Sequence, residues 1–176
     1  MNEQVGGIAG RVLYILTPLV TGLVAAYADL LPLSGSAPRM LAPSLTACIV
    51  YFWTVYRPDL LPPLALFGIG VVLDAVGGLP LGLTALALLL VRGFLLSGQR
   101  FLLAQPFAVI WACFLPVVLL LAALRWALAV LFWGRLFAVE PLLIEAGLTF
   151  AAYPLVGWLL TGLQRRLADT PRAARS

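Results

Sequence analysis

The stretch F-L-L-A-Q-P-F-A-V-I-W-A-C-F-L-P-V-V-L-L-L-A-A-L-R-W-A-L-A-V-L-F-W, Phe101–Trp133, contains a single charged side chain, that of Arg125. An α-helix needs about 20 apolar residues to cross the roughly 30 Å of hydrocarbon in a bilayer. This stretch is longer than that, and it lacks the alternation of apolar and polar residues that is typical of a strand. It therefore predicts a membrane-spanning helix.

The composition of the whole chain agrees with this prediction. Of the 176 residues, 63% are hydrophobic and 10% are charged, whereas a soluble domain has roughly 45–50% apolar and 25% charged residues. Backbone groups in hydrocarbon must be paired within a helix or a closed barrel, and the alternation of barrel strands is absent. We therefore expect an all-α polytopic membrane protein.

The apolar stretches predict six transmembrane helices in a single domain, residues 1–163, followed by an arginine-rich cytoplasmic tail, residues 164–176. The first stretch is too long for the apolar region of a signal peptide, so we expect it to be retained. The second is short, and the fifth is over-long with an expected kink at Pro116. The predicted helices are Val12–Leu33, Leu41–Tyr56, Leu60–Val76, Leu79–Leu96, Phe101–Trp133 and Pro141–Leu163.

The positions of the basic residues predict the orientation, because cytoplasmic loops are enriched in Lys and Arg. With six spans and both termini in the cytoplasm, Arg39, Arg135 and the outer part of the fifth helix with Arg125 face outward. All eleven basic residues are arginine, and topology explains the net charge of +4, so we expect no nucleic-acid partner. The inner side holds Arg11, Arg57, Arg92, Arg100, Arg165, Arg166, Arg172 and Arg175.

Four ionisable residues are predicted near the outer ends of the helices: Asp29, Asp74, Arg125 and Glu145. An ionisable residue inside a membrane costs about 2.5–3.5 kcal/mol on insertion scales, so each is a candidate functional residue. One interpretation is that they reach interfacial water or form a buried pair that fixes helix packing. The other is a polar cavity, open to the outside, that receives a ligand or partner. We specifically predict an ion pair between Asp74 and Arg125.

Small and aromatic residues gather on the second to fourth helices. Gly70, Gly78 and Gly82 would let the third and fourth helices approach closely. Tyr51 and Trp53, with Phe52 and Tyr56, lie at the inner end of the second helix. An aromatic belt that anchors the chain at the interface is one interpretation of them, and a partner-binding face is the other.

The chain has no histidine, and its two cysteines, Cys48 and Cys113, lie inside apolar stretches. The commonest metal ligand and proton shuttle are therefore missing. We expect the cysteines to be small buried hydrophobes, and we expect no metal, no cofactor and no enzymatic activity.

The segment from Pro43 to Leu86 resembles the bacterial rod-shape-determining membrane protein MreD. The resemblance lies in a proline before a helix ending in aromatic residues, then a glycine-rich helix with an intramembrane Asp, F-G-I-G-V-V-L-D-A-V-G-G-L-P-L-G-L-T-A-L. It covers about a quarter of the chain. The matching residues are Pro43, Tyr51, Trp53, Phe67, Gly70, Asp74, Gly78, Leu81, Gly82, Ala85 and Leu86.

The resemblance implies a non-enzymatic component of the cell-elongation machinery in the inner membrane. Proteins of this family associate with the membrane-anchored MreC, and through it with RodA and penicillin-binding protein 2; MreB lies on the cytoplasmic side. Their fold is thought to be similar to that of the six-helix substrate-binding subunits of energy-coupling-factor transporters. The alternative function is therefore that of a small-molecule-binding subunit of a membrane transporter.

Overall fold

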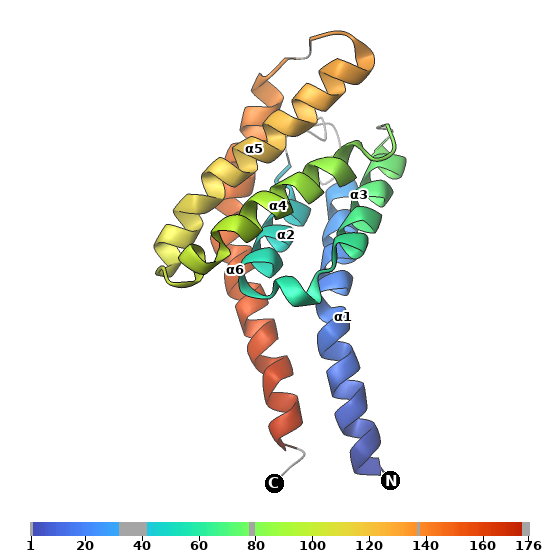
Figure 1. The fold of residues 1–176 in the computed structure, drawn as a ribbon, viewed down its shortest axis with the longest axis vertical. Coiled ribbons are helices and arrows are strands. Elements are labelled where there is room, and N and C mark those ends of the chain that lie inside the picture. Colours follow the sequence, from blue (N-terminus) through green and yellow to red (C-terminus); the bar gives the residue numbers. More distant parts are fainter. Residues whose placement is uncertain (1, 32–41, 78–79, 137, 174–176) are drawn as a thin grey trace.

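The computed structural model describes residues 2–31, 42–77, 80–136 and 138–173, with side chains described only between Leu16 and Gln164. These ranges contain six α-helices and a short 3-10 turn, η2 (Pro58–Leu60), but no strand (Figure 1). The prediction of an all-α protein is thereby confirmed. The helices are α1 (Asn2–Leu30), α2 (Leu45–Tyr56), α3 (Pro63–Gly77), α4 (Leu83–Leu103), α5 (Phe107–Trp133) and α6 (Glu140–Ala173).

Helix α2 forms the centre of the bundle. Nine of its twelve residues are buried, and it packs against α1, α4 and α6. At 1.5 Å per residue it is about 18 Å long, well short of the hydrocarbon thickness of a bilayer. Its environment is protein and not lipid, which explains why an apolar helix this short is stable here.

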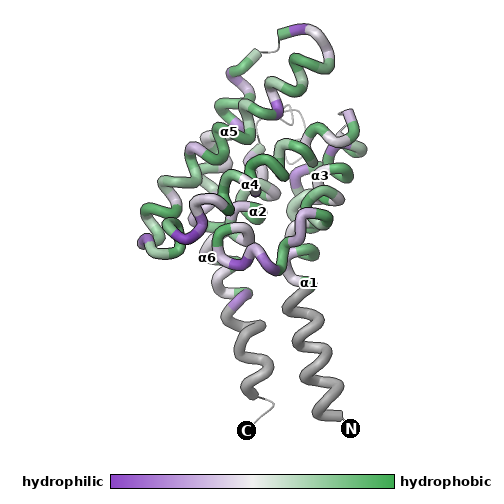
Figure 2. Tube along the Cα trace, in the orientation of Figure 1, coloured by the Kyte–Doolittle hydropathy of each residue, from purple (hydrophilic) through white to green (hydrophobic). Residues whose placement is uncertain are grey.

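Three helical segments are long and apolar enough to cross a membrane: Leu83–Leu103, Phe107–Trp133 and Glu140–Gln164. The other apolar helical segments, Leu16–Leu30 among them, are shorter. Figure 2 shows hydrophobic residues along α4 and α5 and hydrophilic residues at the connections between helices. Large apolar side chains such as Leu131 and Trp158 are 81% and 74% exposed, as expected for a surface that contacts lipid rather than water.

Several helix boundaries differ from the prediction. The turn expected at residues 97–100 lies within α4, which ends only at Leu103. The break comes instead at Gln105-Pro106, because a proline disfavours helical geometry in the residue that precedes it. Helix α6 continues beyond Leu163 to Ala173, so most of the predicted tail is helical.

A proline in α6 is compensated by a side chain from α5. Pro154 has no N–H to donate to the carbonyl of Phe150 one turn earlier. Trp111 Nε1 donates to this carbonyl at 3.0 Å, and the rings of Trp111 and Phe150 stack with centroids 5.0 Å apart. The pair thus connects α5 to α6. Pro116 lies within α5, whose helix is continuous through it.

The aromatic residues of α2 are core residues and not an interfacial belt. Tyr51, Phe52 and Trp53 are at most 2% exposed. Tyr51 Oη donates to the carbonyl of Ile110 at 2.8 Å, and Trp53 Nε1 donates to Thr21 Oγ1 at 3.0 Å. The prediction of an aromatic anchor was wrong for these three because α2 is enclosed by other helices.

The predicted close approach of α3 and α4 occurs at Gly70. A Cβ atom placed there would lie 2.6 Å from the backbone nitrogen of Ala85 and closer still to its Cα. Gly82 has φ +98°, a conformation that glycine adopts without strain, and it precedes α4. Gly68 faces open space, and Gly78 lies outside the described residues.

We predict that Gly70→Ala destabilises the protein by about 1–3 kcal/mol, because the added methyl group meets backbone that cannot rotate away. Gly68→Ala is the matched control on the same helix; nothing lies within 4 Å of its Cβ, and alanine is the better helix former. Thermal unfolding in detergent checks both. An equal effect of the two substitutions would contradict the packing described here.

Candidate functional site

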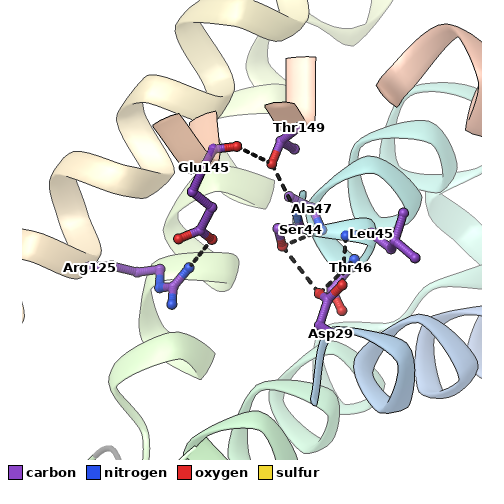
Figure 3. Close-up of polar contacts among 8 residues, drawn as sticks. All are labelled: Asp29, Ser44, Leu45, Thr46, Ala47, Arg125, Glu145 and Thr149. Atoms are coloured by element: carbon purple, nitrogen blue, oxygen red, sulfur yellow. Dashed lines mark hydrogen bonds and ion pairs between the residues drawn. The ribbon is translucent and has the colours of Figure 1, made fainter. Parts of the chain in front are cut away.

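Asp29, at the end of α1, accepts hydrogen bonds from the start of α2. Its carboxylate accepts from the backbone N–H of Leu45 at 2.8 Å and of Thr46 at 3.0 Å, and from Ser44 Oγ at 3.3 Å (Figure 3). The first N–H groups of a helix have no partner within the helix, and the helix dipole favours an anion there. Asp29 therefore joins α1 to α2 by a tertiary cap.

Asp74, near the end of α3, has the same role for α4. It is fully buried, and it accepts from the backbone N–H of Gly82 at 2.9 Å and of Thr84 at 3.0 Å. Glycine at the N-cap of α4 has no side chain that could accept these bonds. Asp74 supplies the missing acceptor, so its charge is compensated by the helix that follows it in the chain.

The ion pair of the cluster joins Arg125 to Glu145. Arg125 Nη1 lies 2.9 Å from Glu145 Oε1, and the two side chains are 28% and 18% exposed (Figure 3). The predicted Asp74–Arg125 pair was wrong, because the Asp74 carboxylate is occupied by backbone N–H groups. Arg125 instead connects α5 to α6.

Thr149 links this pair to the start of α2, and the sequence analysis did not identify it. Its hydroxyl donates to the carbonyl of Glu145 at 2.6 Å and accepts from the N–H of Ser44 at 2.9 Å. A threonine four residues after a helical residue often bonds to its carbonyl, and that spacing is the available signal. Thr149 itself is fully buried.

A cavity of about 250 Å³ lies where these elements meet. Three of the four predicted charges, Asp29, Arg125 and Glu145, line it together with Thr84. Asp74 bonds to the backbone of Gly82 and Thr84 and does not line the cavity. Tyr51, Trp53, Gly70 and Gly82 lie elsewhere. The remaining lining residues are Leu30, Ala42, Pro43, Ser44, Thr46, Ala47, Leu73, Gly77, Leu88 and Leu121.

The residues that line the cavity offer both polar and apolar contacts to a bound molecule. The residues described hold no cluster of three or more potential metal ligands. The cavity has an ion pair, hydroxyl groups and apolar walls, a combination typical of small-molecule sites. Comparison of the chain with family models, curated proteins and solved structures found no match.

We predict that Asp74→Ala and Asp29→Ala each lower the free energy of unfolding by about 1–3 kcal/mol, because buried N–H groups lose their acceptor. Asp74→Asn keeps one acceptor oxygen and should cost less. Thermal unfolding in detergent is the measurement. Asp59→Ala, at an exposed position in η2, is the control and should change stability by less than about 0.5 kcal/mol.

The observed ion pair makes a second prediction. A double-mutant cycle with Arg125→Gln and Glu145→Gln should show a coupling of about 0.5–3 kcal/mol. The same cycle with Arg125→Gln and Asp74→Asn should show coupling near zero. If Arg125 were coupled more strongly to Asp74 than to Glu145, the predicted Asp74–Arg125 pair would be supported and the observed Arg125–Glu145 pair would be contradicted.

Proposed function

We propose that this chain is an MreD-like, six-span protein of the bacterial inner membrane that binds MreC and supports peptidoglycan synthesis during cell elongation. The observation that carries the proposal is that the MreD-like motif makes one packed unit. Gly70 contacts Ala85, Asp74 caps Gly82 and Thr84, and Gly82 has the positive φ that the turn requires. The packing gives a structural reason for the spacing of the motif, and this supports the proposal.

The arrangement of the helix ends supports the proposed threading. The start of α1 and the end of α6 project from the same end of the bundle, and the α5–α6 connection lies at the opposite end (Figure 1). This fits an even number of crossings with both termini in the cytoplasm. In the proposal the six spans are completed by the short α2, which lies inside the bundle, and by α3, which packs against α1 and α4.

The proposed mode of action is lateral contact within the membrane and involves no catalysis. Exposed apolar side chains cover the outward faces of the helices, as for Leu64, Phe94 and Leu155. A transmembrane helix of MreC would pack on such a surface by shape. RodA and penicillin-binding protein 2 would be reached through MreC, and MreB from the cytoplasmic side.

The test is co-purification in detergent with the MreC-like protein of the same organism, together with the shape of cells depleted of this chain. We expect a stable complex and rounding of rod-shaped cells. Gly70→Ala should weaken the complex in parallel with its loss of stability, whereas Gly68→Ala should not. Normal rods after depletion, with no MreC-like protein retained, would refute the proposal.

The cavity favours one alternative, a small-molecule-binding subunit of a transporter. Its Arg125–Glu145 pair and apolar walls are features that such a subunit needs. This function requires saturable uptake that depends on an ATPase module. Uptake that persists without the module, or that is absent from cells expressing the chain, would exclude it.

A further inference from the structure

The cavity contains polar groups whose bonding capacity the fold leaves unused. A guanidinium group has five N–H donors and a carboxylate has two oxygens. Within the described residues, Arg125 donates only through Nη1, to Glu145 Oε1, and Glu145 Oε2 accepts nothing. Asp29 differs from them, because both of its oxygens are already bonded to the start of α2.

A hydroxyl group in the cavity lining is also unused. Thr84 is 6% exposed, and its Oγ1 is buried without a hydrogen-bond partner among the described residues. Thr46 Oγ1 also has no hydrogen-bond partner in good geometry among the described residues. Because it lies near the Asp29 carboxylate, Thr84 is the clearer case of an unused hydroxyl. Buried polar groups in proteins are normally satisfied by protein, water or a ligand.

The other residues that line the cavity are mainly apolar. Leu73, Leu88 and Leu121 line the cavity together with Ala47 and Pro43. A volume of about 250 Å³ lies just below the range of about 300–1,000 Å³ that is typical of ligand sites. The site therefore suits a small organic molecule with an apolar group.

From this combination we propose that the cavity binds a small zwitterion with an apolar side group, of the size of a hydrophobic α-amino acid. Its carboxylate accepts from the free donors of Arg125, its ammonium donates to Glu145 Oε2, and its side group contacts the leucines. Thr84 Oγ1 bonds to either polar end. The Arg125–Glu145 bond stays intact, so that the ligand dipole lies antiparallel to the ion pair.

Charge balance favours a zwitterion over a simple ion. The positive charge of Arg125 is balanced by the carboxylate of Glu145. The negative charge of Asp29 is compensated by the N–H groups at the start of α2. A single anion or cation would add an uncompensated charge to a site with apolar walls, which is costly. A zwitterion supplies both partners and leaves the net charge unchanged.

The experiment compares three molecules that share one branched hydrocarbon group, using the full chain in lipid nanodiscs and isothermal titration calorimetry. L-leucine has both charges, 4-methylpentanoate has only the carboxylate, and 3-methylbutylamine has only the ammonium. We expect L-leucine to bind at least about 10-fold more tightly than the others, because each loses a charge-assisted hydrogen bond of about 1.5–3 kcal/mol.

Variants then assign the residues. Arg125→Gln and Glu145→Gln should each weaken L-leucine binding at least about 10-fold, by the same loss of one charge-assisted bond. Thr84→Val keeps the volume and the backbone cap to Asp74 and should weaken it less. Arg100→Gln and Glu140→Gln, at exposed positions that do not line the cavity, are the matched controls and should bind normally.

Three outcomes would overturn the proposal. The first is that no compound binds at millimolar concentration, which would mean that the cavity holds water only. The second is that either singly charged compound binds as tightly as L-leucine. The third is equal weakening by the control substitutions. The comparison of compounds uses the unaltered chain, so it stands even where a variant fails to fold, and it is independent of MreC co-purification.

Discussion

The fold depends on how the first N–H groups of two helices, α2 and α4, are satisfied by side chains from the preceding helices. An unpartnered buried N–H group costs about 1–3 kcal/mol. At the start of α2 this demand is met by Asp29, and at the start of α4 by Asp74. In both cases the carboxylate comes from the preceding helix. A buried carboxylate and an unpaired helix start would each cost free energy alone. Here they stabilise each other.

This arrangement also places the binding chemistry. The cap on α2 holds Ser44 where its N–H reaches Thr149, and Thr149 in turn bonds to the carbonyl of Glu145. The carboxylate of Glu145 then meets Arg125 across the α5–α6 interface. The cavity is therefore bounded by groups whose backbones are fixed by the same network that fixes α2. A pre-formed site of this kind loses little entropy when a ligand binds.

The all-α class and the position of the charged residues near one end of the helices could be predicted, because hydropathy and segment length depend on the local sequence. The partners of the charges could not be predicted. Whether Arg125 pairs with Asp74 or with Glu145 depends on which helices are neighbours. A single sequence also does not show that the N–H groups of Gly82 and Thr84 need Asp74 as their hydrogen-bond acceptor. The burial of Tyr51 and Trp53 was missed for a similar reason, since an apolar helix facing protein has the same composition as one facing lipid.

The two carboxylate caps have a consequence for how such a chain enters a membrane during synthesis. Asp29 and Asp74 leave the ribosome before the helix whose first N–H groups they bind. If α1 or α3 were inserted by itself, it would carry an unneutralised carboxylate into the hydrocarbon. In the proposed six-span threading, the two members of each hairpin, α1 with α2 and α3 with α4, therefore partition into the membrane most favourably together.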